Sequence, residues 1–254
     1  MFGFGRKKKN EDAEVQETAV EQAQAQINDD PDMRADDTAA PTAVAEERTE
    51  FDRANGPYDT DEKSGTDSYL DLGSLLIKPH PEVALRLEVE DKTQNVIAVT
   101  LQKDKAVLQV QAFAAPKSRG IWDEIRSEIA ESVRAQGGNI EEVDGSLGKE
   151  LKSQIPVTTP DGRKGARVAT FVGVDGPRWF LRGVFTGTAH ADASARAEME
   201  KIFKTMVVHR GEDPMPPRDL LPLSMPAQAQ PEAATPQNAD LEMPERGPEI
   251  AEVR

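Results

Sequence analysis

The stretch GPRWFLRGVFTG, residues 176–187, places two arginines beside three aromatic side chains. If it forms a strand, Arg178, Phe180 and Arg182 lie on one face, with the arginines roughly 13 Å apart at about 3.3 Å per residue. Two arginines around a ring can hold a flat anionic ligand or a nucleic-acid strand. They can equally pair with acidic residues on neighbouring strands while their stems cover Phe180, and the neutral charge of this part of the chain favours that interpretation.

The opposite face of the same strand carries the core residues Trp179, Leu181, Gly183 and Phe185. Replacing Trp179 or Phe185 by alanine should therefore cost about 3–5 kcal/mol. Alanine at Arg178 or Arg182 should cost no more than about 1 kcal/mol if both arginines are exposed.

Other chemical motifs are missing from the sequence. The three histidines, His80, His190 and His209, have no metal-ligand spacing, and there is no cysteine. No Gly-x-Ser-x-Gly elbow or phosphate-binding loop occurs, and the acidic run at residues 58–67 lacks the order of calcium ligands in an EF-hand. No catalytic residue, metal site or cofactor is predicted.

The net charge of −15 is distributed unevenly along the chain. Residues 67–210 hold 20 basic and 20 acidic residues, so the whole acidic excess lies towards the two ends. Both ends are poor in Leu, Ile and Val and cannot bury enough apolar surface to offset the ordering of the backbone. We predict disordered acidic tails at residues 1–56 and 224–254 around one domain at residues 57–223.

No apolar run reaches the roughly 18 residues that a membrane span needs, and the N-terminus lacks the order of a secretory signal. Phe2 and Phe4 precede the basic residues Arg6 to Lys9, which allows weak contact with an anionic membrane surface. The absence of cysteine fits a cytoplasmic protein.

Alternation of apolar and polar residues predicts strands at residues 83–89, 95–102, 105–113, 150–158, 166–174 and 178–187. A helix is predicted from Trp122 to Val133, with Ser118 as a candidate cap and Gly137-Gly138 as the stop. A second helix follows Asp192. We also predict a tight turn at Asp175-Gly176, because glycine adopts positive φ readily.

This order of strand, hairpin and helix occurs twice. It predicts an α+β fold in which two helices pack on one face or end of an antiparallel sheet, as in Mog1/PsbP-like sandwiches by analogy. The analogy rests on the order of elements and carries no function.

Four segments resemble an actinobacterial family defined only as a domain of unknown function. They are GPYDTDE (56–62), YLDLGSLLIKP (69–79), GIWDEIRSEIAESVRAQGG (120–138) and GPRWFLRGVFTG, and the resemblance covers roughly residues 56–223. It implies a cytoplasmic actinobacterial protein and brings no catalytic residue.

An ordered, neutral domain between acidic tails favours a non-enzymatic protein-binding or scaffolding function. The alternative is a protein, or an enzyme, that binds a small anionic ligand, a nucleotide or nucleic acid through Arg178, Phe180 and Arg182. The charge balance makes nucleic acid the less favoured ligand.

Overall fold

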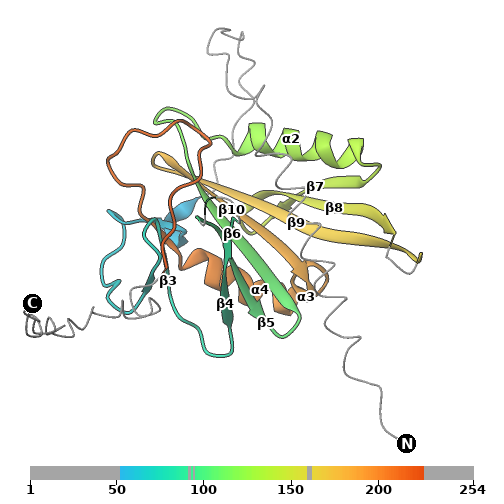
Figure 1. Cartoon of the computed structure of the whole chain (residues 1–254), viewed down its shortest axis with the longest axis horizontal. Helices are drawn as coiled ribbons and strands as arrows, with labels where there is room; N and C mark the ends of the chain where they lie inside the picture. Colours follow the sequence, from blue (N-terminus) through green and yellow to red (C-terminus); the bar gives the residue numbers. More distant parts are fainter. Residues whose placement is uncertain (1–51, 91–92, 94, 159–161, 226–254) are drawn as a thin grey trace, which may run out of the picture.

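The computed structural model describes residues 52–90, 93, 95–158 and 162–225, and within them seven antiparallel strands form the main sheet (Figure 1). In spatial order these are β4 (Ala84–Val89), β5 (Val96–Lys103), β6 (Ala106–Ala114), β10 (Trp179–Gly187), β9 (Lys164–Gly176), β8 (Gly148–Thr158) and β7 (Asn139–Gly145). A small sheet contains β1 (Tyr58–Asp59), β11 (Val207–Val208), β3 (Leu75–Ile77) and β2 (Leu70–Asp71). The helices are η2 (Arg53–Asn55), α2 (Trp122–Ala135), α3 (Thr188–Ala191) and α4 (Ala193–Lys204).

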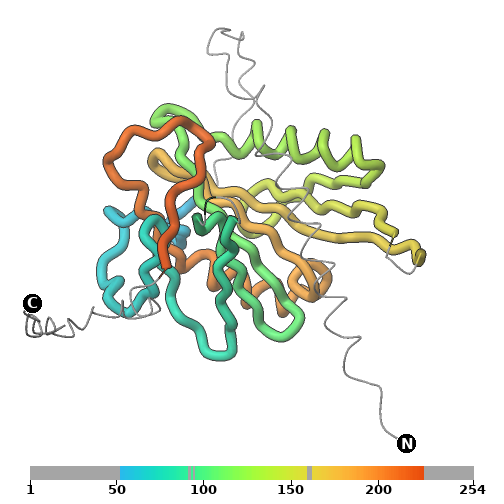
Figure 2. Tube along the Cα trace, viewed as in Figure 1, coloured from blue at the N-terminus to red at the C-terminus, as the bar shows by residue number. Residues whose placement is uncertain are grey.

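The predicted α+β class and the repeated order of elements are confirmed. One unit runs β4, β5, β6, α2, and the other runs β8, β9, β10, α4, so each contributes three strands and a helix. The units meet at the centre of the sheet, where β6 pairs with β10 (Figure 2). The sequence did not predict β7 or the small sheet. The tail predictions fall mainly on residues outside those described, although residues 53–55 form η2 ahead of the predicted domain start.

The two helices pack on opposite faces of the main sheet, which corrects the expectation of one face or end (Figure 1). Successive side chains of β10 point to opposite faces of the sheet, so this strand contributes residues to the core on each face. Trp179, Leu181 and Phe185 join the core beneath α3 and α4, which we name the α4 face. Phe180 and Val184 join the core beneath α2, which we name the α2 face. Both faces of β10 are therefore buried.

Helix α2 begins at Trp122. The side chain of its N-cap residue Ile121 makes no capping hydrogen bond, so the cap comes from another element. The Asp175 carboxylate accepts hydrogen bonds from the backbone N–H of Ile121 at 2.8 Å and of Trp122 at 3.2 Å. A carboxylate suits this end of a helix because of the unpaired N–H groups and the helix dipole. The predicted cap at Ser118 is therefore wrong. The predicted stop is confirmed, with Gly137 at a φ of 71°.

The hairpin between β9 and β10 turns two residues later than predicted. Gly176 pairs with Trp179, so the turn residues are Pro177 and Arg178. Arg178 has a φ of 63°, and proline followed by a residue with positive φ is the pattern of a type II turn. Gly176 is needed for a different reason, since a Cβ there would lie 2.1 Å from the Trp179 indole.

Candidate functional site

The structure separates the three residues predicted to form a ligand-binding face. Arg178 lies in the turn and is half-buried, so the alternation along β10 does not extend to it. Phe180 and Arg182 do share the α2 face, with exposed fractions of 0% and 2%. The three side chains therefore do not form one exposed surface.

Phe180 is part of an aromatic cluster under α2. Its ring lies 5.8 Å from the Trp122 ring and 6.0 Å from the Phe113 ring, between centroids. Gly173 on the neighbouring strand leaves room for this stacking, because a Cβ there would meet the indole of Trp122 at 2.4 Å. Such packing is typical of a core.

Arg182 is a buried cation. Its Nη2 donates a hydrogen bond to Oε1 of Gln111, and its guanidinium lies 5.3 Å from the centre of the Phe113 ring. Its Nε has no hydrogen-bond partner. Burial lowers the pKa of Arg182 to about 10, which leaves the group charged at neutral pH. In the part of the chain that the structure describes, Arg182 makes no ion pair, so the predicted acidic partner is an amide instead.

A second polar cluster lies on the α4 face. Nδ1 of His190 is 2.9 Å from Oγ1 of Thr170. Burial, followed by the charges of Lys152 and Arg196, lowers the pKa of His190. Among the described residues, no three His, Asp or Glu side chains gather closely enough to hold a metal ion.

Arg196 joins two acidic side chains beside this histidine. Its Nη2 lies 2.8 Å from Oε2 of Glu150 and its Nε 2.6 Å from Oε1 of Glu200, while its guanidinium covers the Phe185 ring at 3.7 Å. Burial raises the pKa of Glu150. Each charged group here has a partner of opposite sign, which fits a role in holding α4 against the sheet.

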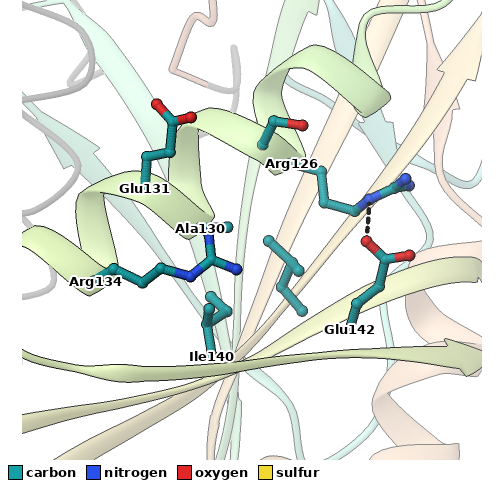
Figure 3. Close-up of a pocket in the computed structure, with 8 residues that line it drawn as sticks. Arg126, Ala130, Glu131, Arg134, Ile140 and Glu142 are labelled. Atoms are coloured by element: carbon teal, nitrogen blue, oxygen red, sulfur yellow. Dashed lines mark ion pairs between the residues drawn. The ribbon is translucent and has the colours of Figure 1, made fainter.

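A cavity of 260 Å³ lies between α2 and the outermost strands β7 and β8, and we name it the α2–β7 groove (Figure 3). Its lining residues are Arg126, Ser127, Ala130, Glu131, Arg134, Ile140, Glu142 and Leu151. Ala130, Ile140 and Leu151 are its apolar members. It is smaller than the roughly 300–1,000 Å³ of pockets that enclose small ligands. The groove therefore fits a single side chain better than a whole small molecule.

Two arginines of α2 point into the α2–β7 groove (Figure 3). Nε of Arg126 lies 2.9 Å from Oε2 of Glu142, and this ion pair ties α2 to β7. Within the described residues, the guanidinium of Arg134 makes no hydrogen bond or ion pair. Glu131 also lines the groove, so two carboxylates, those of Glu131 and Glu142, stand beside the two arginines.

A sequence model of a protein family matches residues 56–232, which is most of the chain. The chain belongs to the family described as "Protein of unknown function (DUF3710)". This confirms the resemblance to a family of unknown function. The match spans Arg182 and the α2–β7 groove.

No curated protein matches this DUF3710 chain in sequence. Two solved structures are similar to it. A crystal structure from Bacteroides thetaiotaomicron is 15% identical over 56% of this chain, with a TM-score of 0.35, and the chain spans about half (48%) of its length. The solution structure of cyanobacterial PsbP (CyanoP) from Synechocystis sp. PCC 6803 is 11% identical, covers 58% of this chain and 98% of that chain, and has a TM-score of 0.32.

The main sheet of the DUF3710 domain ends in two different edge strands. Strand β7 pairs with β8 at every one of its positions, from Asn139 to Gly145, without a shift in register. Strand β4 changes register between Glu88 and Val89. Bulges protect sheet edges from further pairing, so β7 is the more regular edge.

Sequence reasoning missed the α2–β7 groove because β7 carries a weak signal. Residues 139–145 read NIEEVDG, in which the apolar Ile140 and Val143 stand three apart and do not alternate. The turn Gly145 to Gly148 and the strand that follows it were the available signal for a hairpin.

In the described residues of this DUF3710 chain, no helix is both long enough and apolar enough to cross a membrane.

Proposed function

We propose that this domain is a binding module that takes up an extended segment of a partner protein as an added strand beside β7. The outer edge of β7 has no partner strand among the described residues, and β7 is regular along its whole length. Strand addition to an open edge gains its affinity from backbone hydrogen bonds. The regular open edge of β7 beside α2 is the observation that carries the proposal.

The α2–β7 groove supports the proposal because it adds a means of selection. In strand addition, alternate side chains of the bound segment enter pockets next to the edge strand. Helix α2 runs alongside β7 (Figure 1), and the groove between them has the size of a side chain. The proposal is non-enzymatic, and it places the protein in the cytoplasm of an actinobacterium, as the resemblance implies.

The proposal can be tested by selecting random seven-residue peptides on the full chain and mapping their binding by hydrogen–deuterium exchange. We expect every second amide of β7 to exchange rapidly in the free protein and slowly with a selected peptide bound. The amides of β4 serve as the control and should not change. Selected peptides that protect β4, or that leave β7 unprotected, would overturn the proposal.

A pair of proline variants makes the test independent of peptide mapping. Neighbouring N–H groups of a strand point to opposite edges, so one of Glu141→Pro and Glu142→Pro removes an outward N–H and the other removes an N–H bonded to β8. The variant that loses the outward N–H should keep the parent Tm and lose peptide binding. The variant that loses the N–H bonded to β8 should have a lower Tm. Glu142→Gln controls for the lost charge. Full peptide binding by the proline variant that keeps its Tm would contradict strand addition.

One observation favours a second candidate, a small anionic ligand or nucleotide at Arg182. The Nε of this buried cation has no partner. Thermal-shift measurements with phosphate, nucleotides and an oligonucleotide test it, because a ligand at 100 times its Kd adds about 2.7 kcal/mol of stability. We expect no shift, since Arg182 is only 2% exposed. A shift that disappears in Arg182→Met would establish this candidate.

A further inference from the structure

We propose that Arg218 is a positioning residue for α2 and thereby sets the width of the α2–β7 groove. This inference rests on the proposed function, because the groove is where that function places a side chain of the partner segment.

Arg218 belongs to a short segment, residues 218–224, which we name the C-terminal strap. The backbone N–H of Arg218 donates to the carbonyl of Ala114 at 2.8 Å, and the N–H of Ala114 donates to the carbonyl of Asp219 at 2.8 Å. Strand β5 pairs with β6 only as far as Val110, so the C-terminal strap bonds a part of β6 that lies beyond this pairing. The backbone of Arg218 is therefore fixed to β6.

The side chain of Arg218 holds two carboxylates of α2. Its Nη1 donates to Oε1 of Glu128 and its Nη2 donates to Oε2 of Glu124, each at 2.8 Å. These glutamates are four residues apart on one side of the helix and would repel each other without the guanidinium. The other carboxylate oxygen of Glu124 lies 2.7 Å from Nη1 of Arg119, an exposed side chain in the loop before α2. Arg218 therefore ties α2 to β6.

The backbone conformation of Arg218 is strained. Its φ of 73° is uncommon for a residue other than glycine. Such strain persists only where the surrounding contacts fix the residue. The bonds to β6 and to α2 supply those contacts, so Arg218 is held in one geometry between the sheet and the helix.

The α2–β7 groove lies along the other flank of α2. At about 100° per residue, the buried Ile125 and Ile129 stand between the glutamates that Arg218 holds and Ala130, which lines the groove. Arg218 and the groove therefore act on opposite sides of one helix.

An ion pair on the groove flank opposes Arg218. Arg126 pairs with Glu142 of β7 at 2.9 Å (Figure 3), and with Asp123 inside the helix at 3.0 Å. The first pair connects α2 to β7, whereas Arg218 connects it to β6. Without Arg218 the tie to β7 acts unopposed, so α2 should shift towards β7 and narrow the groove.

The first experiment measures the groove in Arg218→Gln without any peptide. NMR follows the NOEs in the full chain between the methyl group of Ala130 and those of Ile140 and Leu151. Glutamine keeps the backbone strain and removes the guanidinium, so we expect these NOEs to strengthen. Arg119→Gln is the matched control, because it also removes a cation bonded to α2, and its NOEs should equal those of the parent. Unchanged or weaker NOEs in Arg218→Gln, or equal changes in both variants, would overturn the inference.

The second experiment measures the peptides selected on the parent against Arg218→Gln. Peptides with a large side chain in the groove should bind about fivefold more weakly, and those with alanine there should bind as they do to the parent. Glu128→Gln breaks one of the two bonds, should give a smaller change of the same kind, and replaces Arg218→Gln if that variant does not fold. An equal loss for every peptide would indicate a general loss of structure and overturn the inference.

The inference and the proposed function fail in different ways. Peptides that protect β7 equally in the parent and in Arg218→Gln, whatever their groove side chain, would overturn the inference and leave strand addition standing. Stronger NOEs in Arg218→Gln, with no peptide that protects β7, would overturn the proposed function and leave the positioning role of Arg218 standing.

Discussion

Replacement of Arg182 by methionine should leave the stability of the domain nearly unchanged. The guanidinium of Arg182 is buried, and this burial lowers its pKa from the ordinary value to about 10. Since one pKa unit corresponds to about 1.36 kcal/mol, burying the charge costs on the order of 3 kcal/mol. Methionine fills a similar volume without that cost.

Two losses offset the gain. The Oε1 of buried Gln111 loses its donor, which costs about 1–3 kcal/mol, and the contact with the Phe113 ring loses its cation, worth about 1–2 kcal/mol. The three contributions nearly cancel, so we expect Arg182→Met within about 1 kcal/mol of the parent. Arg182→Ala has the same losses and adds a cavity, so it should cost at least about 2–3 kcal/mol more than methionine.

Urea unfolding of the parent, Arg182→Met and Arg182→Ala checks this, with the slope m compared alongside the midpoint. Lys201→Met is the control for removing an exposed cation. If Arg182→Ala proves as stable as Arg182→Met, the Arg182 side chain is not buried as the structure shows. The exposed position expected from the sequence would then be correct. If Arg182→Met unfolds the domain, the guanidinium has a stabilising partner that the burial argument omits.

Three further predictions concern single residues. The folded-state pKa of His190 lies below 6.5, so the free energy of unfolding of the parent should fall as pH drops from 6.5 through that folded pKa. Unfolding of His190→Gln, measured between pH 7.5 and 5, should show a smaller fall. A pH dependence equal to that of the parent would refute the assignment. Asp175→Ala removes the acceptor at the start of α2 and should lower stability by about 1–2 kcal/mol, with faster amide exchange confined to the first turn of α2. Trp179→Ala should cost about 3–5 kcal/mol, because the indole is fully buried and its Nε1 donates to Asp59 at 2.7 Å; soluble, cooperative folding with a cost below about 2 kcal/mol would contradict that.

The sequence predicted elements whose own residues carry a clear period. Strand β10 and helix α2 were found because alternation and helical spacing are local properties. The stop at Gly137 and the start of the second helix after Asp192 were found for the same reason, and in the structure the Asp192 carboxylate caps that helix by accepting from the N–H of Ala195 at 2.8 Å.

The state of Arg182 could not be read from its neighbours in the chain. An arginine at an alternate position of a strand is exposed when one face of the sheet is open to water. Here α2 and the aromatic cluster of Trp122 and Phe180 cover the α2 face, and these contacts join segments far apart in sequence. The groove was missed for a similar reason, since it exists only where α2 lies beside β7.

The pairing of β6 with β10 has a consequence for how the domain folds. Phe113 lies opposite Phe180, so the centre of the main sheet joins segments that are distant in the chain. During synthesis, β4–β6 and β7–β9 emerge before β10 and have no direct pairing with each other. Both half-sheets then expose a central edge until β10 arrives to join them, and such long-range closure slows folding. A nascent chain that stalls before Trp179 should therefore aggregate through β6 and β9, whereas release of β10 from the ribosome should mark the onset of protease resistance.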